Sequence, residues 1–176
     1  MIAVCPITRL RECAERFGAR RLLSLVTEDT EIVRPERIAA ADHLTLYFHD
    51  ISEPLCGYVP PCERHVAEAL DFAAADDRAI LVHCYAGVSR STAAAYAIAC
   101  AREPERDEFE LARTLRSLSP TATPNRLIVR LADAALGRRG RMVAAVEAIG
   151  RGRDAFEGAP FALVPMVSPA RELVAV

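Results

Sequence analysis

The sequence has no lysine, glutamine or tryptophan, so arginine supplies all 22 of its basic residues. This bias and the abundance of alanine are typical of a high-GC bacterial coding sequence and say nothing of function. No run of about 18 apolar residues is present, which argues against a membrane-spanning helix. The N-terminus also lacks the apolar core of a signal peptide. We therefore expect a cytoplasmic protein without a membrane partner.

A strong net charge is absent as well. The formal charge is −2 and the isoelectric point is near 6.1. A balance of this kind provides no basic face for nucleic acid, so we expect no nucleic-acid partner. Any recognition of an anion must be local, as in a small pocket.

Six cysteines without a signal peptide favour reduced thiols over a disulfide framework. Cys56, Cys62 and His65 suggest a zinc site, but the spacing is not a recognised one and a fourth ligand is missing. Cys56 or Cys62 could instead form a reversible disulfide with Cys84. The simpler interpretation is that both are buried thiols.

Strand and helix patterns alternate along the chain, which predicts an α/β fold with a central, mostly parallel sheet of four or five strands flanked by helices. The expected strands are 2–5, 21–26, 43–48 and 79–83, and the expected helices are 7–17, 61–76, a long one after Gly87, 107–118, 125–136 and 139–150. We assign residues 1–150 to one domain and residues 151–176 to an irregular extension packed on it.

The segment His83-Cys84-Tyr85-Ala86-Gly87-Val88-Ser89-Arg90-Ser91 lies where a buried strand is expected to turn into a helix. A helix N-terminus carries backbone N–H groups without internal partners and a partial positive charge, so a turn around it can bind one phosphate. Arg90 adds a planar fork that matches two phosphate oxygens. The same positive field favours the thiolate of Cys84, which makes it a candidate nucleophile. Ser89 and Ser91 are suitable cap residues for the helix.

This segment resembles the signature HCxxGxxR[ST] of the cysteine-dependent protein tyrosine phosphatases, and more narrowly the HCxxGxSRS form of their dual-specificity branch. The resemblance covers roughly residues 20–136 and is most specific over 83–92. It implies a phosphocysteine intermediate, no cofactor and no metal, and inorganic phosphate or sulfate as a ligand of the loop. It further implies that His83 orients the loop and helps to stabilise the thiolate of Cys84, and that the Ser91 hydroxyl assists breakdown of the intermediate. The implied phosphate-binding residues are Tyr85, Ala86, Gly87, Val88, Ser89 and Arg90.

Such chemistry requires an acid, because an alkoxide or phenoxide leaves poorly without a proton. Asp50 is the best candidate, since it follows a predicted strand and precedes Cys84 by 34 residues, about where the family places its acid. Glu53 and His49 are the alternatives. Asn125 resembles an asparagine that braces the phosphate loop in the family, although it could be a simple helix cap.

Other functions remain to be weighed against a phosphatase. A sulfur-transferring, rhodanese-like protein needs no upstream acid, and the low-molecular-weight tyrosine phosphatases have the opposite order of acid and nucleophile. An inactive phosphoprotein-binding module usually loses the cysteine or the arginine of the loop.

The expected substrates are phosphotyrosine and phosphoserine/threonine in proteins, with phosphoinositides or other small phosphoesters as the alternative. An arginine cluster could dock an acidic partner or form a solvated helix face: Arg138, Arg139, Arg141, Arg151 and Arg153.

Overall fold

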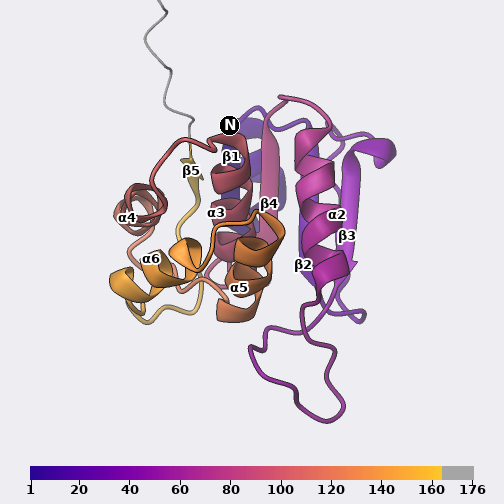
Figure 1. Ribbon diagram of the computed structural model, residues 1–176. Coiled ribbons are helices and arrows are strands. Elements are labelled where there is room, and N and C mark those ends of the chain that lie inside the picture. The colour runs from indigo at the N-terminus through magenta and orange to yellow at the C-terminus, as the bar shows by residue number, and fades with distance from the viewer. Residues whose placement is uncertain (164–176) are drawn as a thin grey trace, which may run out of the picture.

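Within residues 1–163, five strands form one sheet in the order β3-β2-β4-β1-β5 (Figure 1). The computed structural model describes residues 1–163. Its strands are β1 (Ile2–Pro6), β2 (Arg21–Val26), β3 (His43–Tyr47), β4 (Ile80–Cys84) and β5 (Phe161–Leu163). The first four are parallel and β5 is antiparallel to β1. The prediction of an α/β fold with a mostly parallel sheet is confirmed.

Six α-helices accompany the sheet within the described part of the chain. They are α1 (Leu10–Arg16), α2 (Glu63–Ala74), α3 (Arg90–Arg102), α4 (Glu108–Leu118), α5 (Arg126–Ala135) and α6 (Arg141–Ile149). Two short 3₁₀ segments, η1 (Ile7–Arg9) and η2 (Ala40–Asp42), precede α1 and β3. The predicted helices are all present, but most are shorter than expected, because prolines and caps take up their first residues.

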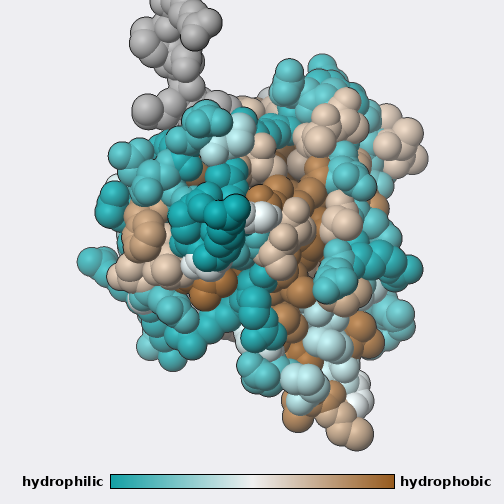
Figure 2. Space-filling model, viewed as in Figure 1, coloured by the Kyte–Doolittle hydropathy of each residue, from teal (hydrophilic) through white to brown (hydrophobic). Residues whose placement is uncertain are grey.

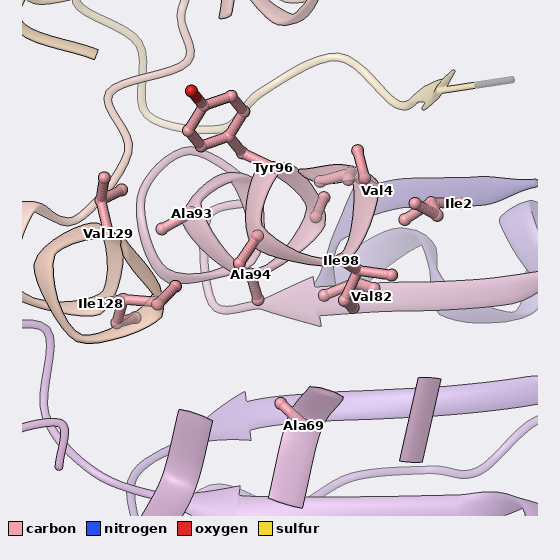
Figure 3. Packing of buried hydrophobic residues seen from close by; sticks show 14 of the residues in the cluster. Ile2, Val4, Ala69, Val82, Ala93, Ala94, Tyr96, Ile98, Ile128 and Val129 are labelled. Carbon is pink, nitrogen blue, oxygen red and sulfur yellow. The ribbon is translucent and has the colours of Figure 1, made fainter. Parts of the chain in front are cut away.

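Alternating side chains of the strands build a core on each face of the sheet. Ile2 and Val4 of β1 face the larger core, beneath α2 and α3, whereas Ala3 and Cys5 face a smaller core with α1. Figure 3 shows α3 lying on the strands that carry Val4 and Val82, with α5 packed beside it. Because α3 is buried nearly all round, its N-terminus is held rigidly against the end of β4.

The carboxyl ends of the parallel strands share one edge of the sheet, at the bottom of Figure 1. The loop after β4 and the long loop over 48–62 both leave from this edge, and the long loop projects away from the body of the molecule. Ligands of parallel sheets usually bind at this edge. The shared direction of the parallel strands therefore brings residues 34 positions apart in the sequence to one place.

The extension after residue 150 was expected to be irregular, and this prediction was wrong for its end. Residues 161–163 form β5, where Leu163 pairs with Ile2 and Phe161 with Val4. Gly158 and Pro160 break the apolar pattern just before this short strand, so the sequence periodicity does not predict it. Residues 164–176 lie outside the described residues.

The surface seen in Figure 2 is mostly polar, but an apolar seam follows the junction of α2 with α3 and α5. The seam is lined by Leu25, Phe48, Pro61, His65, Val66, Ala69, Leu70, Ala94, Ala97, Ile98 and Ile128. None of the helices over residues 1–163 is both long enough and apolar enough to cross a bilayer.

Candidate active site

The loop over 85–89 connects β4 to α3 and is held from outside by its carbonyl groups. Tyr85 O accepts from Ile7 N at 3.1 Å, Ala86 O from Gly158 N at 2.8 Å, and Val88 O from Thr123 N at 2.9 Å. A trans peptide places its C=O and N–H on opposite sides, so these bonds turn the following amides toward the inside of the loop. Within residues 1–163, no backbone N–H of the loop donates to a protein group. The loop thus presents a ring of unpaired donors, which is an anion-binding arrangement.

Gly87 is required by the close approach of the loop to β1. Its φ is 70°, in the left-handed region. A Cβ here would lie 2.7 Å from Pro6 N and 2.8 Å from the carbonyl carbon of Cys5. Both are backbone atoms that cannot move aside, so only glycine allows this path of the chain.

Arg90, the first residue of α3, closes the loop from inside. Its side chain is only 7% exposed, and Nη1 donates to the carbonyl oxygen of Phe48 at 2.9 Å. Nε is buried and has no partner among the described residues. A buried guanidinium with an unpaired N–H, next to unpaired amides, is suited to bind a phosphate oxygen.

Cys84 ends β4 and is buried at the floor of the cleft. Its Sγ lies 3.2 Å from Oγ of Ser91, which is fully buried one residue inside α3. This contact places a hydroxyl beside the sulfur atom, where it can donate a hydrogen bond to a thiolate.

Asp50 lines the same cleft and contacts the loop directly. Its Oδ1 accepts from Ser89 Oγ and from Asn125 Nδ2, each at 2.8 Å. Its Oδ2 has no hydrogen-bond partner within residues 1–163, so a proton on this carboxyl group belongs on Oδ2. The cleft has a volume of about 470 Å³ and is lined by Thr27, Thr30, Asp50, Cys84, Tyr85, Ala86, Val88, Ser89, Arg90 and Ala155.

Two roles expected from the sequence need revision. Ser89 occupies the N-cap position of α3, but its hydroxyl makes no cap bond and donates to Asp50 instead. Asn125 does cap α5, since its Oδ1 accepts from Leu127 N at 3.0 Å and Ile128 N at 3.1 Å. Its Nδ2 donates to Asp50 at the same time, so Asn125 is both a helix cap and a bracing residue. The segment that its side chain braces is the loop that carries Asp50.

The alternative acids lie elsewhere. Nδ1 of His49 accepts from Val59 N at 3.0 Å, and His49 N donates to Val59 O at 2.7 Å. These two bonds connect the beginning of the long loop to its end. Its ring also contacts Tyr58 edge-on. Neither His49 nor Glu53 is among the residues that line the cleft.

His83 is fully buried behind the loop. Its Nε2 lies 2.6 Å from Ser24 Oγ, and Nδ1 lies 3.3 Å from the carbonyl oxygen of Cys84. Burial lowers the pKa of His83 from 6.5 to about 4, with smaller effects from neighbouring groups. His83 is therefore neutral near pH 7 and can orient the loop by hydrogen bonds, but it adds no positive charge.

This low pKa predicts a loss of stability in acid. Between pH 6.5 and about 4, the unfolded chain binds a proton at His83 that the folded chain does not. The contribution of His83 to the free energy of unfolding should therefore be constant above pH 6.5 and fall as the pH is lowered through this window. Burial also lowers the pKa of His43 and His65, which adds to the trend.

Urea unfolding at several pH values measures the effect, with His83→Gln as the comparison. The variant should lose less stability than the parent between pH 6.5 and 4.5. Parallel curves for the two proteins would show that His83 does not titrate in this way.

Other residues of the site were missed in the sequence. Thr27 and Thr30, from the loop after β2, and Ala155, from the extension, line the cleft. Gly158 supports the loop from behind, and a Cβ there would lie 2.9 Å from the carbonyl oxygen of Gly87. No local motif marks these positions, because each acts through a contact that is distant in the sequence.

The cysteines and the arginine cluster have ordinary surroundings. All six cysteines are free. Cys84 is buried, but Cys56 and Cys62 are exposed, so the prediction that these two are buried thiols was wrong. In the described part of the chain, no three potential metal-ligating side chains come together, and Cys62 with His65 forms a capping box at the start of α2. Arg138, expected in a docking or solvated cluster, is buried and pairs with Glu108 at 3.1 Å.

Comparisons with known proteins define the class of fold. No protein-family model and no curated protein matches the chain. Solved structures of phosphatases do match, and they share the α/β fold of this chain.

One of these neighbours is DUSP15, with a TM-score of 0.61 and 16% identity over 84% of this chain and 89% of that one. Another is the PTP-2 phosphatase of Cydia pomonella, with a TM-score of 0.57 and 19% identity over 76% and 84%. A third is the human tyrosine phosphatase-like serine/threonine/tyrosine-interacting protein, with a TM-score of 0.59 and 16% identity over 78% and 92%. At such low identities the likeness establishes the fold.

Proposed function

We propose that the protein is a cysteine-dependent phosphatase that hydrolyses phosphomonoesters through a phosphocysteine intermediate. The observation that carries this proposal is the ring of unpaired amides over 85–89, closed by the buried Arg90 guanidinium and floored by Cys84. The amides have no partner within residues 1–163, and neither has the buried Nε of Arg90, so their collection at one point indicates an anionic ligand. A cysteine beneath that ligand is placed for attack on it.

The reaction begins when the Cys84 thiolate forms a bond to phosphorus and the bond to the leaving oxygen breaks. Arg90 and the loop amides hold the non-bridging oxygens and stabilise the charge that develops on them. The leaving oxygen takes the proton from Oδ2 of Asp50. Water then attacks phosphocysteine, Asp50 accepts a proton from it, and Ser91 donates a hydrogen bond to the departing sulfur atom.

Phosphotyrosine and phosphoserine/threonine in proteins are the substrates that we favour. Arg90 is the only basic residue among those lining the cleft within residues 1–163. A headgroup with several phosphates would need more than one cation, so phosphoinositides are the weaker alternative. An inactive binding module is also disfavoured, because the cysteine, the arginine and a candidate acid meet in one cleft. We also propose a cytoplasmic location, which the six free cysteines support, because thiols remain reduced in that compartment.

A panel of phosphopeptides, phosphoinositides and nucleotides, assayed with and without EDTA, tests the proposal. We expect hydrolysis of phosphopeptides and unchanged rates with the chelator, because the loop itself supplies the positive field. Hydrolysis that EDTA abolishes, or no hydrolysis of any phosphomonoester, would contradict the proposal.

The assignment of the acid predicts a graded response to leaving groups. Asp50→Asn should slow an activated aryl phosphate least, a phosphotyrosine peptide more and a phosphoserine peptide most. The reason is that a phenol of pKa about 7 leaves almost unaided, whereas tyrosine at about 10 and an aliphatic alcohol need a proton. Single-turnover rates for the three substrates measure this, provided that chemistry limits each of them.

Glu53→Gln is the matched control for this series, because it neutralises a carboxylate of the same loop outside the cleft. It should slow all three substrates slightly and equally. A graded loss in Glu53→Gln together with a flat response in Asp50→Asn would transfer the acid role to Glu53.

A further inference from the structure

Three polar side chains form a chain across the sheet behind the candidate site. Ser24 of β2 is fully buried, and its Oγ lies 2.6 Å from Nε2 of His83 and 2.8 Å from Nε2 of His43. Ser24 is directly opposite His83 on one neighbouring strand and opposite Thr45 on the other. Nε2 of His43 also lies 3.1 Å from the Thr45 hydroxyl. The half-buried strand β3 is thereby connected to the residue before Cys84.

The surroundings of His83 determine which atoms carry the protons. Its Nδ1 faces the carbonyl oxygen of Cys84, which can only accept, so Nδ1 carries the hydrogen. In a neutral imidazole Nε2 is then an acceptor, and it takes the single hydroxyl proton of Ser24. Ser24 Oγ must accept in turn, which assigns the hydrogen of His43 to Nε2. All donors in the chain therefore point toward Cys84.

Both rings are neutral near pH 7, as this arrangement requires. The pKa of His83 is lowered to about 4 and that of His43 is lowered as well, in each case mainly by burial. The neighbouring groups that act in the same direction are His43 and Arg90 at His83, and Arg34 at His43, and each disfavours a positive charge on the ring. The backbone hydrogen bond to Cys84 acts in the opposite direction but is outweighed by burial.

The carbonyl group of Cys84 belongs to the first peptide of the anion-binding loop. Because the peptide is planar and trans, fixing this carbonyl toward His83 directs the N–H of Tyr85 to the opposite side. The carbonyl groups of Tyr85, Ala86 and Val88 are held by backbone donors, as described above. The first is held by the imidazole of His83, whose tautomer can change.

We propose that Ser24 and His43 are positioning residues of the site, which hold His83 in the Nδ1–H tautomer and thereby aim the amide of Tyr85 at the bound phosphoryl group. The expected effect of Ser24 and His43 on the rate of hydrolysis rests on the proposed function. The tautomer itself is a property of the resting protein and can be measured without turnover.

Nitrogen-15 spectra of histidine-labelled protein test the assignment directly. The signals of His83 are assigned by elimination, with single variants of His43, His49 and His65. The wild-type protein should show a protonated Nδ1 and an unprotonated, hydrogen-bonded Nε2 at His83. In Ser24→Ala, Nε2 of His83 loses the hydroxyl group that donates to it, so His83 should give a mixture of tautomers. The kcat of this variant should fall about tenfold, the effect of one buried hydrogen bond.

His43 provides the second variant pair, on a half-buried strand that tolerates substitution better than Ser24. His43→Gln keeps an N–H where Nε2 stood and should retain the wild-type tautomer, whereas His43→Leu should behave like a milder Ser24→Ala. Thr45→Val removes the lateral hydroxyl alone and should change neither the spectrum nor kcat.

A pure Nδ1–H tautomer in both Ser24→Ala and His43→Leu would overturn the proposal. A loss of kcat in Thr45→Val as large as that in His43→Leu would also overturn it, because the effect would then be one of packing. If the wild-type protein hydrolyses no phosphomonoester, the proposed function fails, but the spectra still decide the tautomer assignment.

Discussion

Replacing Cys84 with serine is expected to lower kcat by about 10³-fold or more and to leave phosphate binding nearly unchanged. The alcohol of serine is ionised far less than a thiol at neutral pH, so the attacking species almost disappears. The anion-binding groups do not change, because the amides over 85–89 and the Arg90 guanidinium are supplied by other residues. Turnover of an aryl phosphate and calorimetric titration with inorganic phosphate measure the two effects separately.

Cys100→Ser is the matched control for this variant. Cys100 is also buried and free, but it lies in α3 away from the cleft. It should retain kcat within a few-fold. A Cys84→Ser protein that keeps more than a few per cent of the wild-type kcat would show that another group is the nucleophile.

Arg90→Lys is expected to have the second largest effect, with kcat/KM reduced by about 10²-fold to 10³-fold. The substitution conserves the charge but loses the planar fork and the bond from Nη1 to the Phe48 carbonyl group. Both binding and transition-state stabilisation depend on that fork, so KM should rise while kcat falls.

Arg102→Lys serves as the control for Arg90→Lys, since Arg102 lies at the other end of the same helix. Its guanidinium donates to backbone carbonyl groups of Ala73 and Asp76, far from the cleft in the fold. It should change thermal stability slightly and leave kcat/KM unchanged. Equal kinetics for wild type and Arg90→Lys would reduce Arg90 to a structural residue.

The part of the site that could be predicted is the part whose chemistry is local. Residues 83–91 are contiguous, and a strand that turns directly into a helix determines where their amides and side chains point. Asp50 could be proposed from its order in the chain, and the structure places it in the same cleft as Cys84 and Arg90. These positions follow from the four parallel strands, because their carboxyl ends all lie at one edge of the sheet.

The part that could not be predicted depends on contacts between distant residues. Nothing near Ser89 indicates that its hydroxyl turns to Asp50 instead of capping α3. Gly158 reads as a simple strand breaker, yet it supports the loop through Ala86. Ser24 is one polar residue in an apolar strand, and its bonds to two histidines become visible only when β2, β3 and β4 are side by side.

The most direct test of the central claim is mass spectrometry of an acid-quenched reaction of Asp50→Asn with an activated aryl phosphate. The activated phenol leaves without the acid, whereas the breakdown of the intermediate still needs the base, so phosphocysteine should accumulate. Our account predicts that the peptide containing Cys84 gains the mass of one phosphoryl group, and that Cys84→Ser, Asp50→Asn shows no such gain. A phosphoryl group on any other residue would contradict it. So would hydrolysis by the wild-type protein together with no covalent intermediate in Asp50→Asn.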